Sequence, residues 1–247
     1  QRLVLLLDSR NTSKAADNAI AQLRKTFVKG EGWCWTTQYP KYSEWCTLQI
    51  LDILGGLNRM GWLPDDRELK EMIEEAVKYV DRTTAAEFAR YPKSDFTMYC
   101  YMRLKYPDIK QSSAAAGVTA AQVRRIISSW KDHPVATKAV DALILNANSY
   151  AATARQILES LTELATYTPE RGMWWAQFDN RYSMWSMNKV GLTGIVLDAY
   201  ASVAPRSPEV DRIRQWLVLN KADNSWGNTI MTAQVVSSLL LSGTEWT

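Results

Sequence analysis

The amino-acid sequence predicts an all-α protein whose helices form a double ring of antiparallel pairs, an α/α toroid. A tryptophan-bearing turn joins a charged helix to a charge-poor one at Gly32–Trp35, and the same order recurs at Gly172–Trp175 and Asn224–Gly227. Charged helices with one polar face suit an outer ring in water, whereas apolar helices suit an inner ring covered on all sides. No window alternates apolar and polar residues between hairpin turns, so we expect strands to be marginal.

The first predicted helix pair spans residues 12 to 61. The outer helix of this pair runs from Thr12 or Ser13, either of which could cap it, to Gly30, with apolar residues at helical spacing: Ala16, Ile20, Leu23 and Phe27. The inner helix follows the tryptophan turn and stops at Gly61, and its apolar positions are Ile50, Ile53, Leu54 and Leu57. The next charged helix covers residues 67–82, where nine of sixteen residues are charged.

The remaining helices follow from the same spacing rule. We expect four in the middle of the chain, at residues 94–105, 119–131, 134–146 and 150–165, and a loop at 112–117. In the last third, an apolar helix over residues 187–203 is followed by a charged helix at 209–219. An uncharged helix at 228–241 ends the series.

Composition limits the protein's organisation and partners. The 247 residues are 47% hydrophobic, which is enough for one continuous core, so we expect a single domain over residues 1–247. The 29 basic and 26 acidic side chains are scattered, which argues against nucleic acid as a partner. The longest charge-free stretch, residues 224–244, is rich in polar side chains, so we expect no direct insertion into a membrane.

Five tryptophans are the candidate ligand or domain-contact residues. In a toroid every outer-to-inner turn lies at the same end, so the three turns are expected around one mouth. Their rings could stack on a sugar or hold a peptide. The interpretation we favour is that they wedge adjacent helix pairs together, because burying an aromatic side chain contributes roughly 2–3 kcal/mol wherever it occurs. These residues are Trp33, Trp35, Trp174, Trp175 and Trp226.

Catalytic chemistry finds little support in the sequence. Glu44, Asp52 and Asp179 lie in or just after tryptophan turns, as the carboxylate pair of a glycosidase would. With 26 acidic residues such coincidences are expected, and solvated or capping carboxylates are the favoured interpretation. The single histidine, His133, has no cysteine near it, so we expect a surface residue at a helix boundary instead of a zinc ligand or a triad member. We therefore expect no enzyme, catalytic residue, cofactor or metal.

Three cysteines leave one question open. Cys34, Cys46 and Cys100 match no zinc spacing and cannot all pair within the chain. Buried free thiols are the favoured interpretation, and a single Cys34–Cys46 bridge in an oxidising compartment is the alternative.

Several short motifs resemble a known family, the thioester-containing domain of bacterial α2-macroglobulin family proteins. The resemblance covers nearly the whole chain and is weaker from Phe88 to Ala147. The motifs that carry it are Arg2–Asp8, Gln22 to Trp33, Lys41–Ser43 with Thr47, Ile50–Leu57, Ala76–Asp81, Gly172–Trp175, Val190–Tyr200, Arg214–Leu217 and Ser225–Trp226.

The resemblance implies a toroid like those of terpenoid cyclases and protein prenyltransferases, inside a large protein that traps proteases. Such a parent is periplasmic, secreted or on the cell surface, and can carry a lipid anchor. Its partners are the parent's other domains and the target proteases. Family members with the reactive bond carry Cys-x-Glu-Gln, which follows none of the three cysteines here. Because the sequence starts at Gln1 without methionine, we expect a piece of a longer chain, with the motif upstream or missing from the parent.

The expected function is a non-catalytic, thioester-domain-like module that contributes to endopeptidase inhibition by entrapment. Two alternatives remain open: a carbohydrate-active or other small-ligand enzyme that uses a tryptophan-lined mouth, and a plain helical interaction scaffold.

Overall fold

The computed structural model describes residues 9–176, 188–221, 225–226 and 229–243, and within them the protein is mainly α-helical. Two small antiparallel sheets accompany the helices. The helices are α2 (Ser9–Thr26), α3 (Glu44–Arg59), α4 (Arg67–Arg90), α5 (Thr97–Arg103), α6 (Ser113–Ser129), the 3-10 turn η1 (Trp130–Asp132), α7 (Val135–Ala147), α8 (Ala151–Glu163), α9 (Lys189–Val203), α10 (Pro208–Leu219) and α11 (Thr229–Ser242).

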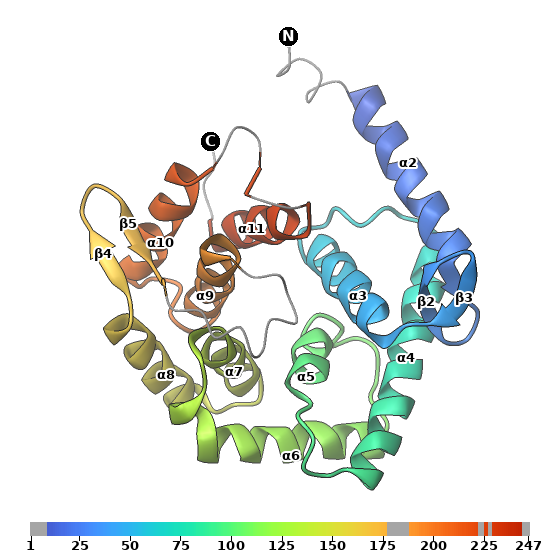
Figure 1. The fold of residues 1–247 in the computed structure, drawn as a ribbon, viewed down its shortest axis with the longest axis horizontal. Coiled ribbons are helices and arrows are strands. Elements are labelled where there is room, and N and C mark those ends of the chain that lie inside the picture. The colour runs from blue at the N-terminus through green and yellow to red at the C-terminus, as the bar shows by residue number, and fades with distance from the viewer. Residues whose placement is uncertain (1–8, 177–187, 222–224, 227–228, 244–247) are drawn as a thin grey trace.

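The helices lie in two layers around a common centre (Figure 1). Each of α3, α5, α7 and α9 contacts the next of these inner helices along the chain, and α11 contacts both α9 and α3, so the inner layer closes on itself. Helices α4, α6, α8 and α10 lie outside it, and α2 extends from one side of the molecule. From α2 to α11 the described helices therefore alternate between the outside and the inside of this arrangement.

Burial explains this alternation. The inner helix α9 buries ten of its fifteen residues, including all those from Gly191 to Leu197. The outer helix α4 buries one face and leaves its charged face in water, and the buried stripe is Leu69, Met72, Ile73, Ala76, Val77 and Val80. One core runs through both layers.

Side-chain caps fix where several helices begin. The Ser43 hydroxyl accepts from Cys46 N at 3.3 Å, Asp66 accepts from Leu69 N at 2.9 Å, and Ser112 accepts from Ala115 N at 3.2 Å. Each cap satisfies a backbone N–H that has no partner within its helix. These contacts set the first turns of α3, α4 and α6.

Several predicted boundaries are wrong. The first outer helix ends at Thr26 instead of Gly30, because Phe27 and Val28 form a strand. Residues 113–117, predicted as a loop, form the start of α6, because Ser112 caps a run of alanines with high helix propensity. Helix α4 continues to Arg90 instead of ending at Arg82, and α5 is shorter than the predicted 94–105. Thr12 and Ser13 lie inside α2, which begins at Ser9, so neither caps it.

Two of the tryptophan turns are β-hairpins, more regular than the marginal strands predicted. Strand β2 (Gly32–Thr36) pairs with β1 (Phe27–Val28) and with β3 (Tyr39–Tyr42). Strand β5 (Gly172–Trp174) pairs with β4 (Thr166–Thr168). Each hairpin has a glycine with positive φ at its turn. Gly30, between β1 and β2, has φ of 77°, and Gly172, the first residue of β5, has φ of 79°.

Candidate functional site

Three tryptophans make the same contact. The indole N–H of Trp33 donates to Leu23 O at 3.0 Å, that of Trp175 to Leu161 O at 2.8 Å, and that of Trp226 to Leu217 O at 2.7 Å. Each carbonyl lies in the last turn of the preceding outer helix. The exposed fractions of the three residues are 0%, 0% and 8%. We call these three contacts the tryptophan joints.

Two of the joints also hold the inner helix. The backbone N–H of Trp33 donates to Thr47 Oγ1 at 2.9 Å, and that of Trp226 donates to Thr232 Oγ1 at 3.0 Å. Both threonines are the fourth residue of their inner helix, α3 and α11. A single residue thus ties the end of an outer helix to the start of the next inner one.

The other two candidate tryptophans differ from each other. Trp174 is half-buried and stacks on Trp216 of α10, with ring centroids 5.9 Å apart. Trp35 is 66% exposed and contacts Trp45 at 5.2 Å. The turns that carry Trp33 and Trp174 lie on opposite sides of the molecule (Figure 1), and Trp33 is wholly buried, so its ring offers no face to a ligand.

A group of charged and polar side chains lines two pockets between the inner helices, with Arg59 exposed, and we call it the axial cluster: Asp52, Arg59, Tyr101, Lys105 and Asp198. The Lys105 ammonium contacts the Asp52 carboxylate and donates to the Asp52 carbonyl oxygen at 3.1 Å. It also lies 5.0 Å from the centre of the Tyr101 ring. The side chains of Asp52 and Lys105 are only 11% and 13% exposed, so each charge depends on the other.

Asp198 is the acid of this cluster that can change its charge near neutral pH. Burial raises its pKa to about 6, opposed by a hydrogen bond from Ser238 and by the charges of Lys105 and Arg59. The charge of Asp52 adds to the rise. A carboxyl group with such a pKa can act as a general acid or base if a substrate reaches it.

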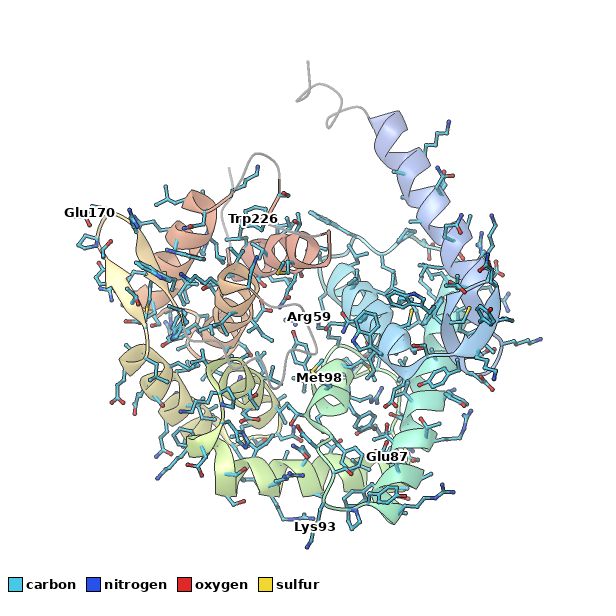
Figure 2. The ribbon with its side chains drawn as sticks, in the orientation of Figure 1. Arg59, Glu87, Lys93, Met98, Glu170 and Trp226 are labelled. Atoms are coloured by element: carbon cyan, nitrogen blue, oxygen red, sulfur yellow. The ribbon has the colours of Figure 1, made fainter. Side chains whose placement is uncertain are left out.

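Two adjoining cavities reach the axial cluster. One measures about 60 Å³ and the other about 300 Å³, and both are lined by Gly56, Tyr101, Lys105, Asp198 and Ser237. Arg59 lies towards the middle of the ring in Figure 2 and lines the larger cavity. The arrangement could hold a small polar molecule, but both carboxylates already have cations beside them.

Sequence reasoning missed most of the axial cluster. It named Asp52 but not Arg59, Tyr101, Lys105 or Asp198. One signal was present: Asp198 is the only acidic residue of α9, a helix predicted to be covered on most sides. An isolated acid in such a helix must find a partner or take up a proton.

The predicted carboxylates are not brought together. Glu44 and Asp52 are two helical turns apart on α3, roughly 12 Å along its axis, which exceeds the separation that glycosidases use. Asp52 belongs to the axial cluster, whereas Glu44 lies at the start of α3. Asp179 lies outside the described residues.

His133 lies at a helix boundary, as predicted, but it is bonded on both sides of its ring. Its Nδ1 lies 2.6 Å from Asp141 Oδ2 and its Nε2 lies 3.0 Å from Ser129 Oγ. The order of residues matches a Ser-His-Asp triad. In this geometry, however, the Ser129 hydroxyl donates to Arg125 O at 2.9 Å, which leaves its oxygen to accept from a protonated His133 ring. The cluster is therefore a charged pair that holds η1 against α7.

The hydrogen bond to Asp141 raises the pKa of His133 above its ordinary 6.5. Because His133 is the only histidine, NMR can follow it without ambiguity. We expect its titration midpoint to lie above 6.5 and to fall in the variant Asp141→Asn. The stabilisation is fully present below about pH 6.5 and is lost as the pH rises through the folded pKa. A midpoint below 6.5 in the native protein would show a neutral imidazole and reopen the catalytic interpretation.

The cysteines are free thiols. Cys46 Sγ lies 3.7 Å from the Cys34 carbonyl oxygen, and no bridge joins the two residues. Burial raises the pKa of the Cys46 thiol and raises that of Cys100 to about 12. Neither forms a reactive thiolate at neutral pH.

The comparisons with known proteins return no family model and no curated protein that matches this chain. Among the described residues, no helix combines the length and hydropathy needed to cross a membrane. In the same part of the chain, no three His, Cys, Asp or Glu side chains are grouped so as to hold a metal ion.

Proposed function

We propose that this chain is a non-catalytic α/α-toroid module of the thioester-domain kind, part of a bacterial α2-macroglobulin family protein that inhibits endopeptidases by entrapment. The tryptophan joints are the observation that carries the proposal. The motifs that resemble the family contain Trp33, Trp175 and Trp226, and these rings are used to hold helices together. The closed inner layer with its outer helices supports the toroid part of the proposal.

In this proposal the module acts as a rigid body in the periplasm or outside the cell. It packs against neighbouring domains of its parent and moves with them when a protease cuts the parent's bait segment. No residue of the chain is assigned to covalent capture, because no Cys-x-Glu-Gln is present and Cys34 and Cys100 are buried. The partners are the parent's other domains and the trapped protease.

A small-ligand enzyme is the second candidate, and the pKa of Asp198 favours it. Such an enzyme would use the axial cluster, because Trp33 and Trp226 are too buried to meet a ligand. However, the positive charges of Lys105 and Arg59 lie near Asp198 and lower its pKa, which makes Asp198 a weaker general base. The structural support for a small-ligand enzyme is therefore weaker than the support for the thioester-domain-like module.

Incubation of the intact parent protein with several endopeptidases tests the proposal. A trapped protease should keep its activity on small peptide substrates and lose most of its activity on large proteins, since only small molecules reach the enclosed active site. The control is the same parent incubated with a protease whose active site has been blocked beforehand, which should leave the parent uncut and unchanged in shape. Equal cleavage of small and large substrates would refute entrapment.

A further inference from the structure

A third pocket lies away from the axial cluster, between the starts of α3 and α5 and the last third of α4. It has a volume of about 310 Å³. We call it the acidic pocket, and it is lined by Glu44, Trp45, Leu48, Gln49, Thr84, Glu87, Asp95, Phe96, Met98 and Tyr99. Figure 2 labels two of these lining residues, Glu87 on α4 and Met98 on α5. The volume is within the range of small-molecule sites.

Two buried polar atoms in the wall of this pocket have no partner among the described residues. Gln49 is 6% exposed and its Oε1 accepts no hydrogen bond, and Thr84 is 2% exposed and its Oγ1 makes none. A buried acceptor without a donor destabilises the protein, and a ligand with N–H groups would remove that cost. The wall of the pocket is thus built for a hydrogen-bond donor.

The charged residues of the pocket also favour a ligand that donates hydrogen bonds. Glu44, Glu87 and Asp95 stand at the rim, and none of the residues that line the pocket is a lysine, arginine or histidine. Asp95 already has donors within the protein, because its carboxylate accepts from Thr97 N at 3.0 Å and from Thr97 Oγ1 at 2.6 Å. Burial and then the charge of Glu87 raise the pKa of Glu44, as expected for two carboxylates that share a site without a cation.

Apolar surface completes the pocket. Trp45 is 42% exposed, and its ring contacts that of Trp35, which extends the aromatic face outward from the rim. Met98 and Phe96 add further apolar lining. Aromatic faces attract cations as well as alkyl chains, so these walls suit a ligand that has both an alkyl chain and a positively charged group.

We propose that the acidic pocket binds an organic cation, an alkylammonium or guanidinium group whose N–H donors reach Gln49 Oε1 and the Glu44 and Glu87 carboxylates. The apolar stem of the ligand lies against Trp45 and Met98. The cation is either a free small molecule or a lysine or arginine side chain of another polypeptide. The site does not depend on the proposed trapping function and would stand if that function failed.

Titration of the protein with n-butylguanidinium tests the proposal, followed by NMR of the Met98 methyl group and assigned with Met98→Leu. The matched control ligand is n-butylurea, which has the same shape and no charge. We expect a saturable shift with the cation and none with the urea. A short arginine-containing peptide provides a second arm: tighter binding than n-butylguanidinium indicates a polypeptide side chain as the occupant, and weaker binding indicates a free small cation.

Three variants make the test specific. Glu87→Gln removes an exposed rim charge, and Gln49→Leu removes the buried acceptor; each should weaken binding at least about tenfold, because a hydrogen bond to a charged group contributes roughly 1.5–3 kcal/mol. Glu159→Gln makes the same charge change on the exposed face of α8 and should leave affinity unchanged. If Gln49→Leu does not fold, the affinity of Glu87→Gln for n-butylguanidinium is the deciding measurement. No saturable shift, equal binding of the urea, or equal loss in Glu159→Gln would overturn the proposal.

Discussion

Replacing Trp33 with alanine should lower the free energy of unfolding by about 3–5 kcal/mol, the usual loss for a buried tryptophan. The ring is fully buried, contacts Phe27 edge-on with centroids 5.2 Å apart, and donates to the end of α2. Its removal leaves a cavity and takes one of two hydrogen bonds from the Leu23 carbonyl, which still accepts from Thr26 Oγ1 at 3.3 Å. Chemical denaturation followed by circular dichroism measures the change.

The neighbouring Trp35 provides the control. It lies in the same strand and is 66% exposed, so Trp35→Ala should cost less than about 1 kcal/mol. Trp33→Phe should fall between the two, since it keeps much of the ring but loses the hydrogen bond. If Trp33→Ala and Trp35→Ala lowered stability equally, the joint would not hold the helices as described.

The second large effect is expected at Gly172. This residue has φ of 79°, and an added Cβ would stand 2.2 Å from Arg212 O and 2.8 Å from Trp216 N. Both atoms belong to the backbone of α10, so they cannot move aside without shifting the helix. Left-handed strain of about 1–2 kcal/mol adds to an overpacking cost of about 1–3 kcal/mol, and Gly172→Ala should therefore destabilise by about 2–5 kcal/mol.

The variant Gly30→Ala distinguishes backbone strain from the contact with α10. It has nearly the same φ, 77°, but an added Cβ would meet nothing within 4 Å. Gly30→Ala should therefore show the strain alone, about 1–2 kcal/mol. The difference between the two variants, measured by the same denaturation experiment, is the cost of the contact with α10. Equal losses would mean that the hairpin does not approach α10 so closely.

Much of the fold could be predicted because helix position follows from local patterns. The spacing of apolar residues and the density of charge distinguished α4 from α9, and the recurring tryptophans marked the outer-to-inner turns. The loop predicted at 112–117 was wrong because serine is common in loops, and its use as a cap depends on the residues that follow. The hairpins were missed because strands of two to five residues are too short to show an alternating pattern.

The candidate sites were harder to predict because they join distant residues. Asp52, Lys105 and Asp198 come from three inner helices or their ends, and only the closure of the inner layer brings them together. The exposure of each tryptophan also depends on tertiary structure: Trp33 and Trp35 are two residues apart, yet one is wholly buried and the other is mostly exposed. Sequence could identify the residue type but not which ring enters the core.

Hydrogen exchange at the indole N–H groups tests the central claim most directly, because it observes each tryptophan joint separately. Buried N–H groups that donate to a helix end exchange only when the structure opens, so those of Trp33, Trp175 and Trp226 should be protected by factors of at least about a thousand. The indole N–H of Trp35 should exchange at nearly the rate of a free indole. Protection of Trp35 equal to that of the other three, or rapid exchange at Trp33 and Trp175, would contradict the assignment of the joints.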